Sequence, residues 1–435
     1  MTKLQASLTQ LQATIEIFHN GAWRTAAVFT PSARHLALGY KGSASIDYDL
    51  DYAYESTAEE SLPNIAFNYP VSFGSYDTPT WPAFMLDIIP TGAGRRVWLR
   101  RIGRADGPEA DWMLLLQGTG NPPGNLRIAE AAMKPVNPHP GFDMDEIIEK
   151  KADFIEYAEE RGAVVAGATD VQGDAPKYLL ARDHAGRWHP DGSLPDTDVM
   201  DSWLVKFPRG KTERDRLVLR NEAPYLEVAR WFGLKVGAAL EYCDDSLFVP
   251  RFDRATVDGR FQRYGLETIC SAAEVAEFGK QGDHLRFCKA VAASSSDANA
   301  DLLEYVRRDI LNAALRNTDN HGRNTALLKA HGQATLSPVY DFAPMFLDPD
   351  GIPRASRWPG VLEPNIGRPD WAKIDEAMAG FCKAFALRDA FAADSEKVRR
   401  LPDVMRQFNV EDEVINGVAR RCEEIADDLF EAGRR

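Results

Sequence analysis

The sequence NTDNHGRN, residues 317–324, is the most informative part of the chain for its fold class. It directly follows the most regular helical pattern of the chain, in which apolar residues recur at helical spacing over residues 301–316. Gly322 and the density of Asn and Asp predict a tight polar loop rather than a continued helix. A hairpin is predicted over residues 325–336, with its turn at 331–333. We therefore expect a buried helix, a polar loop and a short hairpin in this order.

On the predicted helix, Arg307, Arg308 and Asp309 fall on the face away from the apolar residues, so we expect them to be exposed. The cluster SSSD at 294–297 supplies candidates for the N-cap of this helix.

Two carboxylates and an amide in this region suit phosphoryl transfer. Asp319 and Asn324 are separated by four residues, the D-x-x-x-x-N spacing of the kinase catalytic loop, in which Asp is the base and Asn a metal ligand. Asp341, in the sequence Asp-Phe-Ala, follows the hairpin where the Asp of a kinase D-F-G motif would lie. Such chemistry needs a carboxylate near the acceptor hydroxyl and oxygen ligands for Mg²⁺. The D-x-x-x-x-N match alone is common in polar turns, and its position between helix and hairpin favours the catalytic interpretation.

Lys206 lies in the apolar sequence WLVKFP, a predicted strand. Burying the charged group of a lysine there costs desolvation free energy unless an anion or a carboxylate pairs with it. Kinases place their phosphate-binding lysine on such a strand. The alternative is an edge-strand lysine whose ammonium group lies in water. A helix is predicted to follow, with Asn221 as its N-cap and Pro224 in its first turn. Glu222 and Glu227 on this helix are both candidate partners of the lysine.

A glycine-containing segment, GATDVQGDAPK at 167–177, precedes a predicted strand over 178–181. Glycines before a strand allow backbone N–H groups to approach phosphates. The segment matches neither the P-loop pattern nor the dinucleotide-binding pattern, so an ordinary loop is the alternative.

The composition of the 435 residues narrows the class of protein. It is 44% hydrophobic and 27% charged, which is typical of a globular chain. The net charge of −14 argues against a free-standing nucleic-acid binder and leaves open a local basic patch or a basic partner. No apolar run approaches the length of a membrane span, and the N-terminus lacks the apolar segment of a signal peptide.

The cysteines are odd in number and lack C-x-x-C spacing, so they predict reduced, mostly buried thiols and no zinc site, in a cytoplasmic protein without membrane contact. The five are Cys243, Cys270, Cys288, Cys382 and Cys422.

The elements change along the chain from strands to helices. Strands dominate up to about residue 130, and the proline-rich sequence KPVNPHPG at 134–141 predicts a linker. An amphipathic helix is predicted over 143–161, strands return until about 252, and helices dominate after about 272. The fold class predicted is α+β, with two lobes, a β-rich N-terminal lobe and a mainly helical C-terminal lobe. The predicted domains are a β-rich subdomain at 1–135, a second subdomain of the N-lobe with the glycine loop and the lysine strand at 136–253, and a helical catalytic lobe at 254–435.

Taken in order along nearly the whole chain, these segments resemble the HipA family, the kinase toxins of bacterial toxin–antitoxin pairs. The matching segments are NGAW at 20–23, IPTG at 89–92, the glycine loop and strand at 173–180, the lysine strand at 202–208, the helix at 220–234, RFDR at 251–254, and NTDNHGRN at 317–324 with YD at 340–341.

The resemblance implies a protein-kinase-like fold and a serine/threonine protein kinase that uses ATP and Mg²⁺. It implies that Asp319 is the general base and that Asn324 and Asp341 are metal ligands. The residues implied in nucleotide binding are Lys206, Lys177, Gly173, the hinge residues Val249, Arg251 and Phe252, and His321, which either positions the phosphate or the loop or makes a structural hydrogen bond.

Three segments depart from the family, and one of them is LET at 266–268, where members usually read close to Q-E-D. Members often carry an autophosphorylated serine in the phosphate loop, where this chain has Thr169 and Asp170, so either Thr169 is modified or Asp170 makes the switch absent. Members often have a glutamate before the RFDR sequence, where Pro250 stands here. Because proline has no N–H, adenine contacts would come from neighbouring carbonyls or from the amide of Val249.

The resemblance also implies partners. The substrate would be a cytosolic protein, typically an aminoacyl-tRNA synthetase, whose phosphorylation arrests growth. A HipB-like helix-turn-helix antitoxin would neutralise the kinase, and the kinase would associate with DNA only through that antitoxin. Two other functions stay open: a small-molecule phosphotransferase of the antibiotic-resistance type, and a non-catalytic corepressor in an antitoxin–operator complex.

Overall fold

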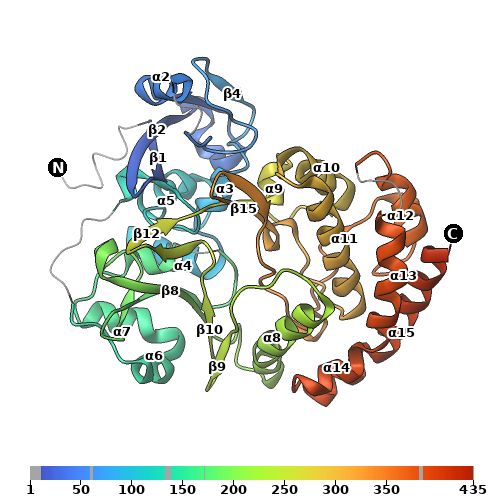
Figure 1. Cartoon of the computed structure of the whole chain (residues 1–435). Coiled ribbons are helices and arrows are strands. Elements are labelled where there is room, and N and C mark those ends of the chain that lie inside the picture. Colours follow the sequence, from blue (N-terminus) through green and yellow to red (C-terminus); the bar gives the residue numbers. More distant parts are fainter. Residues whose placement is uncertain (1–10, 59–61, 133–138, 171, 382–385, 435) are drawn as a thin grey trace. The chain divides into compact units, whose positions relative to one another are not determined.

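The computed structural model describes residues 11–58, 62–132, 139–170, 172–381 and 386–434, which form two compact units (Figure 1). Strands predominate in the first unit and helices in the second, which confirms the predicted α+β class with its two parts. The units interleave along the chain: the first comprises Met1–Arg209, Cys243–Glu267 and Glu274–Phe278, and the second Gly210–Tyr242, Thr268–Ala273 and Gly279–Arg435. The predicted three-domain division stays a prediction, and its linker at 134–141 lies largely outside the described residues.

The first sheet of the first unit has the strand order β4-β3-β2-β1-β5, with antiparallel neighbours throughout. Its β1–β2 hairpin turns at Asn20 and Gly21, both of which have positive φ, the backbone that a two-residue hairpin turn requires. Ile15, Ile17 and Phe29 are fully buried. The strands are β1 (Ala13–His19), β2 (Ala22–Pro31), β3 (Ala44–Tyr48), β4 (Tyr76–Thr78) and β5 (Leu126–Ile128).

Short helices complete this core. Trp81 and Trp112 pack near Phe29, with ring centroids 5.1 and 6.3 Å from it, and aromatic rings contribute large buried areas. The helices are α2 (Leu50–Ala58), α3 (Met85–Ile88), α4 (Gly92–Ile102) and α5 (Asp111–Gln117), and the 3₁₀ turns are η1 (Ala33–Lys41), η2 (Pro108–Ala110) and η3 (Ala129–Ala131).

The second sheet has the strand order β7-β6-β8-β10-β9, and its strands contain the predicted lysine and the start of the predicted hinge sequence. β6 pairs antiparallel with β8, which pairs antiparallel with β10. The strands are β6 (Lys177–Asp183), β7 (Trp188–Pro190), β8 (Val199–Lys206), β9 (Glu241–Cys243) and β10 (Ser246–Pro250), with β11 (Arg254–Val257), β12 (Arg260–Arg263) and β13 (Gly265–Thr268) nearby in sequence.

The prediction of one helix over 143–161 is wrong in one respect, because the chain forms two helices there with a break between them. Lys151 adopts φ 50°, a left-handed conformation that ends the first helix. The predicted apolar face is present, since Ile147, Phe154 and Ile155 are buried. The resulting elements are α6 (Met144–Lys150), η4 (Lys151–Asp153) and α7 (Phe154–Glu160), followed by η5 (Ala166–Thr169) and η6 (Asp196–Asp198).

In the second unit, helix α8 (Glu213–Phe232) begins earlier than predicted. Its N-cap is Thr212, whose hydroxyl accepts from the N–H of Asp215 at 3.2 Å, while the Asp215 carboxylate accepts from the N–H of Thr212 at 2.9 Å. The prediction that Asn221 caps this helix is therefore wrong. Asn221 is buried within it and bonds to Glu411, and Pro224 lies in the helix interior.

The other helices of this unit include α11, the helix predicted before the polar loop. Asp297 caps it, as the cluster at 294–297 predicts, through a bond from the N–H of Ala300 at 3.1 Å. The expectation that Arg308 and Asp309 are exposed is wrong, since both side chains are buried among polar groups. The helices are α9 (Ile269–Ala272), α10 (His284–Ser294), α11 (Ala298–Ala314), α12 (Trp371–Met378), α13 (Ala386–Arg399), α14 (Leu401–Gln407) and α15 (Asp412–Arg434).

The predicted hairpin after the polar loop is confirmed, with Leu327 paired to Leu336 and Ala330 to Gln333. Its strands are β15 (Ala326–Ala330) and β16 (Gln333–Leu336), and the short parallel pair β14 (Gly282–Asp283) and β17 (Ser356–Arg357) and the 3₁₀ turns η7 (Gly322–Asn324), η8 (Met345–Leu347) and η9 (Gly360–Leu362) complete the unit.

Among the described residues, no helix combines the length and the apolar character needed to cross a membrane. Cys270, Cys288 and Cys422 are buried thiols and Cys243 is an exposed one, while Cys382 lies outside the described residues.

Candidate active site

The loop 317–324 lies between α11 and β15, as predicted. Gly322 is packed so closely that a Cβ atom there would lie 2.6 Å from Cζ of Phe287 and 2.7 Å from Sγ of Cys270. Such distances leave no room for a side chain. A glycine is therefore required for the loop to lie against α9 and α10.

Asp319 and Asn324 are joined directly. Nδ2 of Asn324 donates to the main-chain oxygen of Asp319 at 2.8 Å, which leaves the Asn324 amide oxygen as the acceptor of that side chain. The Asp319 side chain is 29% exposed, and its Oδ1 lies 3.6 Å from Nε2 of His321. The loop thus combines a solvent-accessible carboxylate with an oriented amide.

Asp341 is held next to this loop by the residue before it, Tyr340. The Tyr340 hydroxyl donates to the main-chain oxygen of Arg323 at 2.8 Å. Asp341 has φ 54°, a conformation uncommon for residues other than glycine and often found at functional sites. Phe342 is buried, with its ring centroid 5.6 Å from that of Tyr225. The buried Phe342 and the Tyr340 bond together hold Asp341 at this position.

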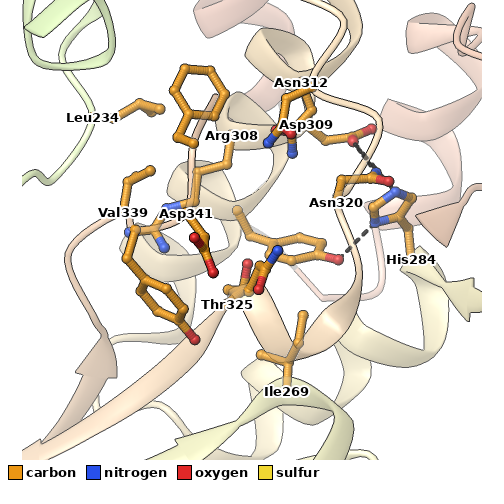
Figure 2. A pocket seen from close by; sticks show the side chains of 15 residues that line it. Leu234, Ile269, His284, Arg308, Asp309, Asn312, Asn320, Thr325, Val339 and Asp341 are labelled. Carbon is orange, nitrogen blue, oxygen red and sulfur yellow. Dashed lines mark hydrogen bonds and ion pairs between the residues drawn. The ribbon is translucent and has the colours of Figure 1, made fainter. Parts of the chain in front are cut away.

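One pocket in the second unit brings Asn324 and Asp341 together (Figure 2). It encloses about 30 Å³, room for roughly two waters or an ion with its hydration. Its lining is polar at the catalytic loop and apolar at Leu234 and Val339. The lining residues are Leu234, Ile269, His284, Tyr305, Arg308, Asp309, Asn312, Asn317, Asn320, Asn324, Thr325, Val339, Tyr340, Asp341 and Phe342.

The donor set fits Mg²⁺. The carboxylate of Asp341 and the amide oxygen of Asn324 are hard oxygen ligands, and Mg²⁺ in kinases is held by one or two such groups together with phosphates and water. His321, predicted to position the phosphate or the loop, does not line this pocket, and neither does Asp319.

In the first unit, Lys177 and Lys206 lie directly opposite each other in the β6–β8 ladder. Opposite residues of an antiparallel pair project to the same face of the sheet. The two residues are 8% and 6% exposed. Both lysines therefore bring positive charge to the same face of the sheet, which suits an anion.

Gly173 lies against Lys177 of this pair. A Cβ atom at Gly173, which has φ 105°, would lie 2.5 Å from Nζ of Lys177. The N-terminus of α4 holds the loop, because the N–H of Ala93 donates to the oxygen of Gly173 at 3.0 Å and Thr91 Oγ1 accepts from the N–H of Gly173 at 3.2 Å. Thr91 and Gly92 belong to the IPTG sequence noted above. This sequence therefore helps to hold the loop at Gly173 in place.

The start of the glycine loop is buried. Asp170 accepts from Nε1 of Trp98 at 3.1 Å and from the N–H of Asn121 at 2.9 Å. Burial raises the pKa of Asp170 to about 7, although these hydrogen bonds act to lower it. Thr169 is 1% exposed, and Nη1 of Arg101 lies 3.4 Å from its hydroxyl. A kinase could phosphorylate Thr169 only after this turn leaves its packing.

The RFDR sequence is built into a buried ion cluster. The Arg251 guanidinium is 4% exposed and pairs with Asp191 and with Asp253, the latter at 2.7 Å. Asp253 also accepts from the N–H of Gly124 at 2.7 Å. Arg251 thus joins the end of β10 to Asp191 after β7, while Asp253 holds the loop after α5. The predicted contact of Arg251 with the nucleotide stays a prediction. Val249 and Phe252 are half-buried on either side of it.

The glutamates proposed as partners of Lys206 differ in environment. Glu222 is buried on α8, whereas Glu227 is partly exposed and pairs with Arg230 at 3.0 Å. The sequence did not predict the buried network next to the loop 317–324, which contains Asn320, Asp309, Arg354 and Glu363. The position of Asn320 inside the polar loop was a sequence signal that could have identified it. Arg354 and Glu363 lie in an irregular segment that has no periodic sequence pattern.

Comparison with known proteins shows the family and the fold of the chain. The model of the HipA-like C-terminal domain family matches residues 169–412, more than half of the chain. Y4mE of Sinorhizobium fredii, which is named as a candidate kinase, is 23% identical over 411 residues, covering 89% of this chain and 90% of its own. Among solved structures, the complex of the Shewanella oneidensis MR-1 toxin–antitoxin system HipA, HipB and its operator DNA contains a chain that matches with a TM-score of 0.67 and 16% identity, covering 96% of this chain and 97% of that one. The chain therefore has a two-lobe, kinase-like fold and belongs to the HipA family.

Proposed function

We propose that this protein is a serine/threonine protein kinase that depends on ATP and Mg²⁺. The observation that carries the proposal is the pocket in which Asn324 and Asp341 meet, directly beside the loop that presents Asp319. A base, an amide oxygen and a second carboxylate in this order are the parts that phosphoryl transfer requires of the catalytic lobe.

In the proposed reaction, Asp319 orients the acceptor hydroxyl and accepts its proton. The partial exposure of its carboxylate leaves it accessible to a macromolecular substrate. Asn324 and Asp341 would hold Mg²⁺, which neutralises charge on the phosphates when bound. His321, whose ring lies 3.6 Å from Asp319, would position the loop or a phosphate.

The first unit would hold the nucleotide. Lys177 and Lys206 supply positive charge for the phosphates, and Gly173 allows the loop backbone to come close to Lys177. The hinge residues Val249, Arg251 and Phe252 would lie near adenine, with Val249 contributing backbone groups because Pro250 has no N–H. Thr169 is the proposed site of autophosphorylation.

We further propose the family's biological setting. The acceptor would be a hydroxyl of a cytoplasmic protein such as an aminoacyl-tRNA synthetase. The neutralising partner would be a HipB-like, DNA-binding antitoxin, which is the kind of assembly that the Shewanella HipA forms with HipB and operator DNA. The net charge of −14 supports a role in which a basic partner, rather than this chain, contacts DNA.

The deciding experiment measures phosphate transfer from labelled ATP with Mg²⁺ by the purified protein. Asp319→Ala and the isosteric Asp319→Asn are the matched variants, and mass spectrometry locates phosphate on the chain itself. Candidate acceptors are a panel of aminoacyl-tRNA synthetases and, separately, a panel of aminoglycosides. Transfer to protein that is lost in both variants supports the proposal. Transfer to aminoglycosides alone contradicts protein specificity, and failure to bind ATP contradicts the kinase assignment and favours the corepressor function.

A further inference from the structure

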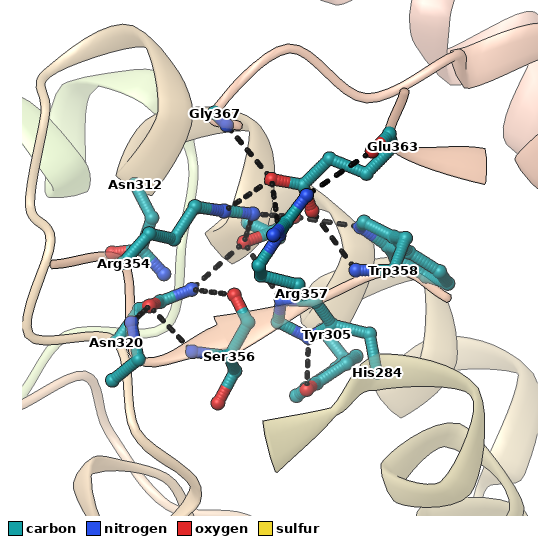
Figure 3. Close-up of polar contacts among 12 residues, drawn as sticks. His284, Tyr305, Asn312, Asn320, Arg354, Ser356, Arg357, Trp358, Glu363 and Gly367 are labelled. Carbon is teal, nitrogen blue, oxygen red and sulfur yellow. Dashed lines mark hydrogen bonds and ion pairs between the residues drawn. The ribbon is translucent and has the colours of Figure 1, made fainter. Parts of the chain in front are cut away.

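A buried polar network lies behind the catalytic loop in the second unit (Figure 3). It joins α11, the loop, and the irregular segment after η8. Its charged members are almost fully enclosed: the side chains of Asp309 and Arg354 are 2% and 4% exposed, and that of Glu363 is 0% exposed. Such groups are costly to bury unless every one of them is paired.

Asn320 is the member that belongs to the catalytic loop. Its Oδ1 accepts from the N–H groups of Ala355 and Ser356, each at 3.0 Å. Its Nδ2 donates to the main-chain oxygen of Ser356 at 3.1 Å and to Oδ1 of Asp309 at 3.5 Å. The amide therefore uses both its donor and its acceptor capacity to join the loop to the 355–356 backbone.

The 355–356 backbone is itself fixed. Ser356 pairs with Gly282 in the parallel β14–β17 pair, and a Cβ atom at Gly282 would lie 2.2 Å from Oγ of Ser356. Arg354 donates to both carboxylate oxygens of Asp309 at 2.7 Å and to Glu363 at 3.0 Å. A planar guanidinium between two carboxylates defines one orientation of the segment.

The remaining contacts leave the network electrically balanced. Glu363 also accepts from the N–H groups of Trp358 at 2.9 Å and Gly367 at 2.7 Å, and Arg357 approaches it at 3.8 Å. His284, 3.3 Å from Asp309, bonds to the Tyr305 hydroxyl at 2.7 Å. Burial lowers the pKa of His284 to about 4, so it is neutral near pH 7. Two carboxylates thus face two guanidinium groups.

This network acts on the catalytic residues through one peptide group. The peptide between Asp319 and Asn320 carries the oxygen that accepts from Nδ2 of Asn324. Asn320 is 9% exposed, whereas the neighbouring Asp319 side chain is 29% exposed, so consecutive side chains of the loop serve as anchor and as reactive group. Holding Asn320 therefore fixes both the base and the orientation of the proposed metal-binding amide.

We propose that Asn320 is a positioning residue for phosphoryl transfer and that the Asp309–Arg354–Glu363 cluster holds it in place. The proposal rests on the kinase function proposed above. It predicts that the network determines catalytic rate and metal binding at Asn324, and that nucleotide binding by the first unit is independent of it.

The test compares Asn320→Ala with Asn221→Ala, a matched control. Asn221 is also a buried amide, 1% exposed, with bonds to Leu217 and Glu411, and it lies on α8 outside the catalytic loop. Both variants lose a similar set of buried hydrogen bonds, so both should lose thermal stability. Only Asn320→Ala should lower kcat, by tenfold or more, with KM for ATP changed less than twofold.

Two further readouts do not need kinase activity. Hydrogen exchange followed by mass spectrometry should show faster exchange across residues 317–324 in Asn320→Ala and unchanged exchange there in Asn221→Ala. Binding of Mn²⁺, measured by electron paramagnetic resonance, should weaken at least fivefold in Asn320→Ala. Asp309→Asn, which keeps the shape of Asp309 and removes its charge, should show the same pattern. If Asp309→Asn does not fold, Asn320→Asp, which retains the acceptor oxygen, serves in its place.

The outcomes separate the two proposals. If the wild-type protein transfers no phosphate, the kinase function fails, while exchange and Mn²⁺ binding still report on Asn320. Unchanged loop exchange and unchanged Mn²⁺ binding in Asn320→Ala would overturn the positioning role. An equal loss of kcat in Asn221→Ala would also overturn it, because the effect would then come from general loss of stability.

Discussion

Lys177 lies directly opposite Lys206 across the β6–β8 ladder, and both residues are buried. Opposite residues of an antiparallel pair project to one side of the sheet, so both lysines bring positive charge to that side, which suits an anion. The loop at Gly173, tied to the N-terminus of α4, closes over Lys177. This pairing connects the folding of the first unit with the phosphate binding proposed for it.

We expect Lys206→Met to weaken ATP binding at least tenfold and to leave adenosine binding within twofold of wild type, because the proposed contact of the lysine is with the phosphates rather than with the base. Calorimetric titration with both ligands measures the difference. Lys289→Met, at an exposed position on α10, is the control and should change neither. Equal weakening for ATP and adenosine would contradict a phosphate-specific role.

The second prediction concerns the metal. Because Asn324 contributes one neutral oxygen and Asp341 a carboxylate, Asn324→Ala should raise the Mg²⁺ concentration needed for half-maximal activity at least tenfold, and Asp341→Asn should abolish activity. Chelation with EDTA should abolish activity of the wild type reversibly. The measurement is initial rate against Mg²⁺ concentration at saturating ATP. A Mg²⁺ dependence unchanged in Asn324→Ala would remove this residue from the metal site.

The sequence predicts the parts of the site that depend on neighbours in the chain. The density of Asn, Asp and Gly at 317–324 marks a loop, and the alternation after it marks a hairpin, since both signals are local. Asp309 was expected at the surface because a charged residue on a helix usually faces water. Its partner Arg354 lies far along the chain in a segment without a periodic pattern, so only the folded structure reveals that the charge is neutralised inside.

The start of α8 shows a second limit of prediction from the sequence. Asn221 before Pro224 resembles a helix start, yet the capping box of Thr212 and Asp215 begins the helix two turns earlier. Two valid local signals compete there, and the buried bonds of Asn221 to Glu411 decide between them. The break at Lys151 carried no glycine or proline that would have announced it.

A third prediction uses the close packing of Gly322. A methyl group at this position meets Phe287 and Cys270 at distances below 3 Å, so Gly322→Ala must displace the catalytic loop. We expect a loss of about 1–3 kcal/mol in the free energy of unfolding and a larger fractional loss of kcat than of ATP affinity. Denaturant unfolding and steady-state kinetics measure both. Gly380→Ala is the control and should behave as wild type, since among the described residues, its two chain neighbours aside, no heavy atom lies within 4 Å of the new methyl group.

The last prediction concerns pH and Asp170. Burial raises the pKa of this carboxyl from 3.8 to about 7, so the folded chain holds the proton more tightly than the unfolded chain does. The stabilisation is complete below pH 3.8 and is lost as the pH rises to about 7. The free energy of unfolding should therefore fall by about 2–3 kcal/mol between about pH 5 and pH 8 from this group alone.

Asp170→Asn should remove that part of the slope, as measured by denaturant unfolding across the pH series. The slope is the proper readout, because Asn presents one oxygen where two donors, Trp98 and Asn121, now reach two oxygens, and absolute stability will change for that reason also. Asp174→Asn, at an exposed position in the same loop, is the control and should retain the wild-type slope. If wild type and Asp170→Asn show the same slope, Asp170 is ionised throughout this range and its two hydrogen bonds outweigh its burial.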